Sequence, residues 1–142
     1  FERAVSYNNK HVNSWNSMGL AFEAKNDYDL ALKNLNKAVE IDPDFSEGWY
    51  NLGNVFKSKK EYDNAIQNYI KATDINPDFA KAWFFMGCAY FDKKDYNKAV
   101  ENLENAIKLD PNLAQDVNPL LKDFKKTIDN LQETLSFSFL NK

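Results

Sequence analysis

The sequence predicts an all-α protein, a solenoid of antiparallel helix pairs that is closed by a long C-terminal capping helix. Two observations lead to this prediction. A group of apolar residues on a helical spacing recurs every 34 residues, as Trp15, Trp49 and Trp83 show. Each recurrence is followed by a polar break, a second helical stripe and a proline. A fixed period of this length is typical of stacked repeats, in which neighbouring units bury a continuous core.

The pattern within one period predicts a helix, a short turn, a second helix and another short turn. Trp49, Leu52, Gly53 and Phe56 fall at i, i+3, i+4 and i+7, which is one stripe of a helix. The polar segments AKND, SKKE and DKKD then separate the two helices of each unit. A proline ends the second helix because it cannot continue the helical hydrogen bonding. The second-helix stripes are Ala31, Leu35 and Ala38; Ala65, Tyr69 and Ala72; and Ala99, Leu103 and Ala106.

The glycine inside each first helix has to be explained, since it costs about 0.5–1 kcal/mol relative to alanine. Gly19, Gly53 and Gly87 occupy the same position of the three units. We expect them to face the small second-helix residues Ala31, Ala65 and Ala99, so that the paired helices approach closely. The apolar surface buried by that approach, at about 25 cal/mol per Å², would offset the loss of helix propensity.

These motifs resemble the tetratricopeptide repeat family, whose pattern places Trp, Leu, Gly and Tyr on the first helix and Ala, Phe, Ala and Pro after them. The match covers 12–113, as units 12–45, 46–79 and 80–113. Met replaces Leu at Met18 and Met86, and Phe replaces Tyr at two further positions. The resemblance implies a right-handed α-solenoid. The stretch NLGNVFKSKKEYDNAI is also similar to the arrays attached to O-linked N-acetylglucosamine transferase.

The register also predicts the two ends of the chain. Counting back 34 positions from Leu35 and Ala38 reaches Phe1 and Ala4, so residues 1–10 are predicted to be the second helix of a truncated preceding repeat. That reading makes the chain part of a longer array. After the last repeat a long apolar stripe predicts a capping helix over 114–136, with Pro119 near its start. The alternating Ser and Phe of 137–142 predict a strand-like or unstructured tail.

Composition argues against several classes of function. The chain of 142 residues is 44% hydrophobic, has a formal net charge of −3 and contains one cysteine. Charges of both signs are interspersed, whereas a nucleic-acid-binding surface needs clustered Lys and Arg. No run of about 20 apolar residues is present for a membrane span. We therefore expect neither nucleic acid nor membrane as a partner, and a cytoplasmic location.

No motif indicates catalysis, so we do not expect an enzyme. His11 is the single histidine of the sequence, and the pattern shows no set of Cys, His and carboxylate residues of the kind that a metal site requires. Cys88 has no base nearby in the pattern to activate it as a nucleophile. A single cysteine also forms no internal disulfide. We expect no metal and no cofactor.

The resemblance implies that the first helices line a concave groove that binds an extended peptide or a helix. Tyr50 and three Phe residues would then form an aromatic anchor patch, since aromatic anchors dominate such energetics. The alternative is that the C-terminal helix covers the three Phe residues. By register the groove also includes Glu23 and Lys57. The predicted groove site is Asn16, Tyr50, Asn51, Asn54, Lys81, Phe84, Phe85 and Phe91.

Two binding modes of the family can be compared with the residue types. Chaperone-binding members grip a terminal carboxylate with Lys, Asn, Asn, Lys and Arg. The corresponding residues here are Asn16, Leu20, Asn51, Lys81 and Phe85, which match at two positions, so we expect this clamp to be absent. An asparagine ladder would need Asn at the positions of Ser17, Asn51 and Phe85, and only one is present. Asn51 and Asn54 could still bind a peptide backbone, because an amide both donates and accepts.

Three hypotheses of function follow. The first is a non-catalytic scaffold that binds a peptide or helix of a partner protein in the groove. The second is a regulatory or substrate-docking segment of a larger enzyme such as a glycosyltransferase. The third is a self-associating array, which forms homo-oligomers through the truncated N-terminal repeat or the C-terminal tail.

Overall fold

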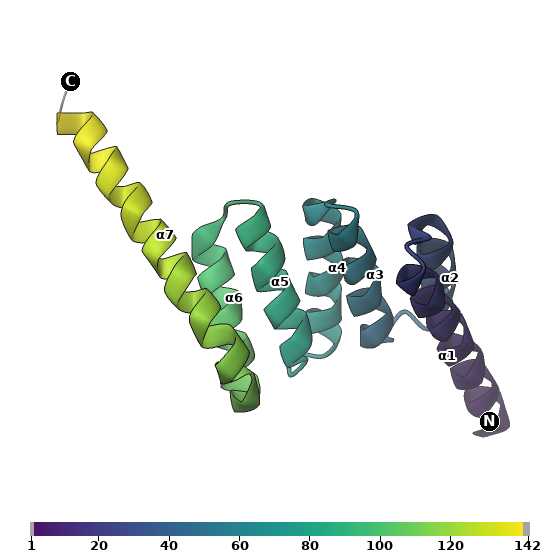
Figure 1. The fold of residues 1–142 in the computed structure, drawn as a ribbon. Helices are drawn as coiled ribbons and strands as arrows, with labels where there is room; N and C mark the ends of the chain where they lie inside the picture. Colours follow the sequence, from purple (N-terminus) through teal and green to yellow (C-terminus); the bar gives the residue numbers. More distant parts are fainter. Residues whose placement is uncertain (1, 141–142) are drawn as a thin grey trace.

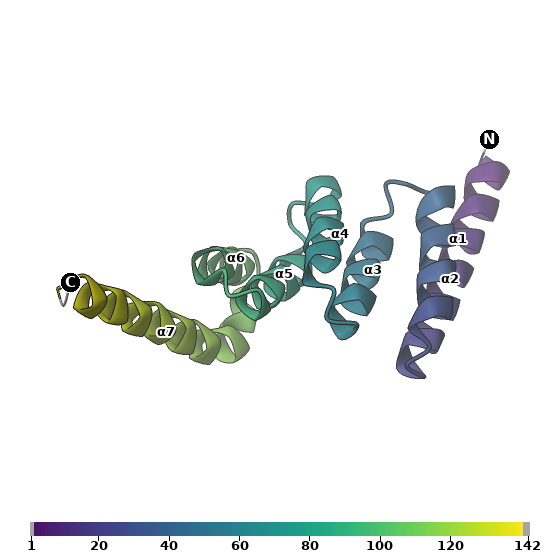
Figure 2. The same cartoon turned by 90° about the horizontal axis from the view of Figure 1, so that it is seen from above.

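The chain forms a single row of helix pairs. The computed structural model describes residues 2–140, with side chains described from residue 10 onward. Successive pairs stand side by side in chain order, with the two termini at opposite ends (Figure 1), and they rotate relative to one another along the row (Figure 2). The helices are α1 Glu2–Ala24, α2 Tyr28–Ile41, α3 Ser46–Ser58, α4 Tyr62–Ile75, α5 Ala80–Asp92, α6 Tyr96–Leu109 and α7 Ala114–Leu140, with the 3-10 helix η1 Pro111–Leu113 before the last.

Both predicted chain ends need correction. Helix α1 runs without interruption from Glu2 to Ala24, so residues 2–10 extend the first helix of the first repeat and are not a separate second helix. No proline or glycine lies in this stretch to end a helix, unlike the later junctions at Pro43 and Pro77. Phe1 lies outside the described residues.

At the other end α7 continues to Leu140, so 137–140 are helical and not the strand-like or unstructured tail that the alternation predicts. The serine hydroxyls bond back along the helix, Ser136 Oγ to the Gln132 carbonyl at 2.9 Å. Residues 141–142 lie outside the described residues. Pro119 lies near the start of α7, as expected, although it is inside the helix and beyond its first turn.

The recurring Trp and Pro are joined by a hydrogen bond. Trp49 Nε1 donates to the Pro43 carbonyl at 2.8 Å, and Trp83 Nε1 donates to the Pro77 carbonyl at 2.9 Å. Helices α3 and α5 are thereby tied to the turns that precede them. A bond between these two motif positions explains why both recur with the same period.

The turn inside each pair has a common geometry. The third residue of each polar break adopts a left-handed conformation, with φ of 60° at Asn26, 62° at Lys60 and 67° at Lys94. Asp27 and Asp95 then cap the second helices, accepting from the backbone N–H three residues on. The polar breaks therefore do more than separate two helices, since they reverse the chain and start the next helix.

The first-helix glycines are required by close packing, but against a different partner than predicted. A Cβ atom placed on Gly53 would lie 2.5 Å from Cε1 of Tyr69, and one on Gly19 would lie 2.5 Å from Cγ of Leu35. The large second-helix residue four positions after the alanine therefore fills the space. The alanine contributes its backbone, since Ala31 O lies 3.3 Å from the same Cβ position on Gly19.

Helix α7 closes the core of the third repeat. Val117, Leu121 and Phe124 are buried against Ala99 and Leu103 of α6. Beyond them the helix projects away from the row (Figure 1). There the apolar stripe loses its cover, and the exposed fraction rises from 45% at Leu131 to 59% at Leu135 and 78% at Phe139.

Candidate functional site

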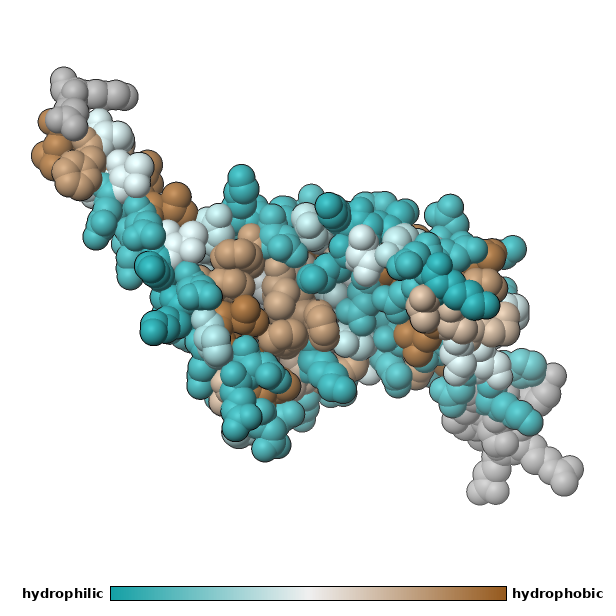
Figure 3. Space-filling model, viewed as in Figure 1, coloured by the Kyte–Doolittle hydropathy of each residue, from teal (hydrophilic) through white to brown (hydrophobic). Residues whose placement is uncertain are grey.

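The helices α1, α3, α5 and α7 form one face of the row, which we call the groove face. Viewed from this side, apolar side chains gather over α5 and beside it along α7, while α1 and α3 are more polar (Figure 3). The predicted site residues lie on α1, α3 and α5, which are three of the helices that form this face. Their availability to a ligand differs from residue to residue.

Two predicted polar contacts are used inside the protein. Asn51 Nδ2 donates to Asn16 Oδ1 at 2.8 Å. The two residues are only 3% and 6% exposed, respectively. This buried amide pair links the first helices of the first two repeats. The Asn51 side chain is therefore not available to bind a peptide backbone, which corrects the expectation drawn from its residue type.

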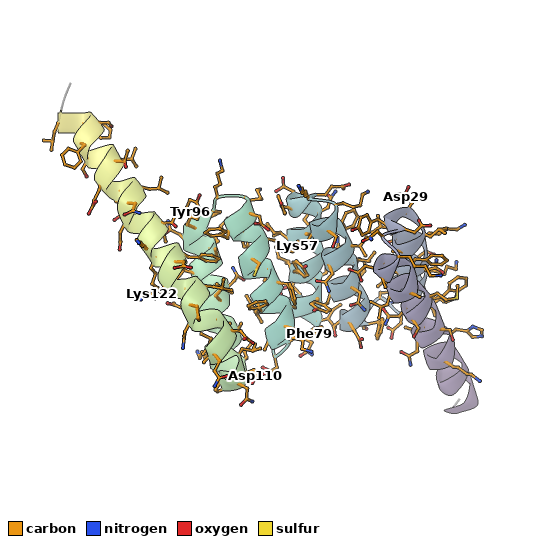
Figure 4. The ribbon with its side chains drawn as sticks, viewed as in Figure 1. Asp29, Lys57, Phe79, Tyr96, Asp110 and Lys122 are labelled. Carbon is orange, nitrogen blue, oxygen red and sulfur yellow. The ribbon has the colours of Figure 1, made fainter. Side chains whose placement is uncertain are left out.

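The equivalent pair one repeat later is aromatic. Tyr50 and Phe85 lie 34 residues after Asn16 and Asn51, and their ring centroids are 5.9 Å apart. Tyr50 also packs on Phe79 at 4.9 Å, at the turn before α5 (Figure 4). The same two positions therefore hold a polar contact at the first junction and an apolar contact at the second.

The side chain of Asn54 already forms a hydrogen bond within the protein. Its Oδ1 accepts a hydrogen bond from the hydroxyl of Tyr69 at 2.7 Å. Burial raises the pKa of Tyr69 far above its ordinary value, so this hydroxyl keeps its proton and stays a donor. The residue is half-buried and lines a hollow described below, and its side chain also interacts with the Tyr50 hydroxyl.

Two of the three phenylalanines pack on the core cluster to which the capping helix contributes. Phe91 stacks on Phe124 of α7 with ring centroids 3.7 Å apart and planes 10° from parallel. Phe84 packs on the cluster that contains Phe124 and meets Phe85 edge to face at 5.0 Å. The alternative considered above, that the C-terminal helix covers these phenylalanines, thus applies to Phe91 and in part to Phe84. Phe85 packs with Tyr50 on the second core cluster instead.

A hollow of about 280 Å³ opens on the groove face beside Phe85. Lys57 Nζ lies 3.9 Å from Asp92 Oδ2, so this cation already has a partner. Glu23 is half-buried, and loss of hydration raises the pKa of its carboxyl above the ordinary value of 4.5. Lys81, a predicted site residue that is not among those lining the hollow, is exposed at the start of α5. The lining residues are Glu23, Asn54, Lys57, Ser58 and Phe85.

Sequence reasoning left three of these lining residues outside the predicted site. Glu23 and Lys57 follow from the register alone, because they occupy the same groove-facing position in successive repeats. Ser58 has no such signal, since it is the last residue of α3. Its proximity to Glu23 depends on how the two pairs rotate.

The described residues offer little for other chemistry. Burial raises the pKa of the Cys88 thiol, an effect that the nearby Lys57 opposes only in part. Among residues 10–140, whose side chains are described, no group of three His, Cys, Asp or Glu side chains is placed to hold a metal ion. Within the same part of the chain, no helix is both long and apolar enough to cross a bilayer.

The amide pair makes a stability prediction. Changing Asn51→Phe should lower the free energy of unfolding by about 1–3 kcal/mol, because the Asn16 amide would be left buried without its partner. Adding Asn16→Tyr copies the aromatic pair of the second junction and should recover most of that loss. Urea denaturation of the single and double variants measures both effects. Two losses that simply add would contradict the account.

Stacked antiparallel helix pairs with a face built from the first helix of each pair define a helical-repeat solenoid. A family model described as tetratricopeptide repeat matches residues 46–79 and 80–113, and one described as TPR repeat matches 19–60. Together these matches cover more than half of the chain. The chain therefore belongs to the tetratricopeptide repeat family.

Solved structures of similar fold are TPR domains. The first TPR of Spaghetti (RPAP3) bound to HSP90 peptide SRMEEVD superposes with a TM-score of 0.81 at 19% identity, covering 84% of this chain and 94% of that one. The Sgt2 TPR domain from Aspergillus fumigatus gives a TM-score of 0.80 at 25% identity, covering 86% and 82%. The TPR2B domain of yeast Sti1 in complex with pHsp70 gives 0.79 at 20% identity, covering 83% and 98%. A search of curated proteins finds no match.

Proposed function

We propose that this chain is a non-catalytic scaffold that binds a peptide or a helix of a partner protein on the groove face. The observation that carries the proposal is the hollow beside Phe85, which adjoins the Tyr50 and Phe85 rings and is rimmed by polar groups. An apolar surface with a polar rim marks an interaction site. Similar folds that are bound to an HSP90 peptide or in complex with pHsp70 support the same use of the scaffold.

The ligand we propose differs from an acidic chain terminus such as that of SRMEEVD. A carboxylate-binding site needs several cationic donors to offset desolvation of the ligand. At the positions of such a clamp this chain has Phe85 and Leu20 in place of polar groups, and Asn51 is bonded to Asn16. Of the five clamp positions, only that of Lys81 holds a cationic side chain. We infer that an internal segment with apolar side chains is the ligand.

The proposal is tested with peptides selected from a random phage-displayed library on immobilised wild-type chain. Phe85→Ala should weaken the selected binders by about 30-fold, because truncating an aromatic anchor typically costs about 2 kcal/mol. Ile70→Ala serves as the matched control, since Ile70 is an exposed apolar residue of α4, a second helix. Circular dichroism confirms folding of both variants. Binders that lose affinity equally for both variants, or for neither variant, would show that the groove face is not the binding surface.

A second candidate is self-association, and it rests on a different surface. The exposed stripe of α7, with Leu131, Leu135 and Phe139, is an apolar surface of the kind that marks contact sites. Under this proposal the mass measured by sedimentation rises with concentration, and Leu135→Gln abolishes the rise. A monomeric mass at every concentration would exclude it.

A further inference from the structure

The hollow on the groove face joins residues from all three repeats. Glu23 comes from the end of α1, Asn54, Lys57 and Ser58 come from α3, and Phe85 comes from α5. Figure 4 shows Lys57 near the end of α3, on the side of the neighbouring pair. A side chain that enters this hollow would therefore contact three repeats at once.

The two charged residues that line the hollow differ in whether they have an ion-pair partner. Lys57 has Asp92 at 3.9 Å. Glu23 takes part in none of the ion pairs among the residues whose side chains are described. Its carboxyl is half-buried, and the loss of hydration raises its pKa. Of the two charged residues that line the hollow, the carboxylate is thus the one that lacks a counter-ion.

Among the residues whose side chains are described, none makes an ion pair with the Glu23 carboxylate, and Lys57, which lines the same hollow, is paired with Asp92. Asn54 Oδ1 is taken by the Tyr69 hydroxyl. The nearest groove residues beyond it, Tyr50 and Phe85, are aromatic. An acidic ligand side chain would be repelled by Glu23, and an aliphatic one would bury the carboxylate further without pairing it. A cationic side chain with a long apolar stem removes both costs.

Arginine fits these neighbours better than lysine does. Its planar guanidinium can pair with a carboxylate through two parallel hydrogen bonds. It can also stack on an aromatic ring such as Phe85, while its alkyl stem covers apolar surface. A lysine ammonium offers a point charge and lacks the planar fork.

We propose that the partner segment inserts an arginine side chain into this hollow, with its guanidinium on the Glu23 carboxylate and its stem against Phe85. The inference rests on the proposed function, because it names the chemistry of a ligand for the same groove. The recognised charge is then opposite in sign to the glutamates and aspartate of the HSP90 peptide SRMEEVD.

The test starts from the random phage-displayed library selected on wild type, on Glu23→Gln and on Glu47→Gln. Glu47 is the matched control, since it is an exposed glutamate of α3 and its substitution makes the same change of charge. We expect arginine to be enriched among binders of wild type and of Glu47→Gln, and not among binders of Glu23→Gln. SRMEEVD is measured alongside and should bind none of the three.

The selected peptides are then synthesised with citrulline in place of arginine, which removes the charge and nearly keeps the shape. Citrulline should weaken binding to wild type by about tenfold, the effect of losing a charged hydrogen bond, and should leave binding to Glu23→Gln unchanged. Equal weakening in both proteins would place the arginine elsewhere and overturn the inference.

The outcomes separate the two proposals. Binders that depend on Phe85 but show neither arginine enrichment nor a citrulline effect would overturn the inference and leave the groove as a peptide site. A selection without any binder that depends on Phe85 would overturn the proposed function, and the inference with it.

Discussion

Replacing Phe124 with alanine should release α7 from the array and lower the free energy of unfolding by about 3–5 kcal/mol, the usual cost of a buried Phe→Ala change. Phe124 is buried and stacks face to face on Phe91 at 3.7 Å. It is also the last buried residue of α7 before the helix leaves the row. Losing this contact exposes the part of the third-repeat core that Phe124 covers.

The effect of Phe124→Ala should be strongest near α7, because repeat arrays are stabilised mainly by contacts between neighbouring units. Urea denaturation measures the total loss, and amide hydrogen exchange reports where it falls. Leu131→Ala is the matched control, an apolar truncation on the same helix at a residue that is 45% exposed, and should change stability little. A similar loss in both variants would show that the projecting half of α7 is stabilised by contacts as strong as those of Phe124.

Changing Gly53→Leu should lower the free energy of unfolding by about 3 kcal/mol, at the upper end of the range for an overpacked core. A Cβ atom at this position already lies 2.5 Å from the Tyr69 ring. That ring is fully buried and anchored by its bond to Asn54, so it has little room to move. The cost should exceed the gain in helix propensity, which is about 1 kcal/mol.

Thermal and urea denaturation measure the Gly53→Leu effect. Glu47→Leu is the matched control, because Glu47 lies on the same helix in an exposed position and receives the same side chain. We expect a change within about 0.5 kcal/mol for the control. Unaltered stability of Gly53→Leu would refute the packing explanation of the recurring glycine.

The interior of the array could be predicted from the sequence because each signal there is local. The stripe of Trp49, Leu52, Gly53 and Phe56 specifies a helix face within two turns, and Pro77 ends the unit. The ends could not be predicted in this way. Matching apolar residues 34 positions before Leu35 and Ala38 indicated a separate helix, but no turn follows residues 2–10, and the helix continues to Ala24.

The groove could be predicted only as far as the face on which a residue lies. Register places Asn51 and Phe91 on the first helices. Whether each is available depends on residues far away in the chain, because Asn51 is bonded to a side chain 35 positions earlier and Phe91 is covered by α7. These contacts depend on the rotation between successive pairs, which no single repeat encodes. The Glu23 hollow depends on the same rotation.

The two repeat junctions also limit how such a chain can be rebuilt by duplication or shuffling of its units. The first junction pairs Asn16 with Asn51, and the second pairs Tyr50 with Phe85 at the same positions. A duplicated second repeat would set Tyr50 against Asn51, and deletion of that repeat would set Asn16 against Phe85. Either event buries an amide beside a ring, at a cost of about 1–3 kcal/mol. Units that are nearly identical in outline are therefore not interchangeable, and their order along the chain is itself encoded in the side chains at their borders.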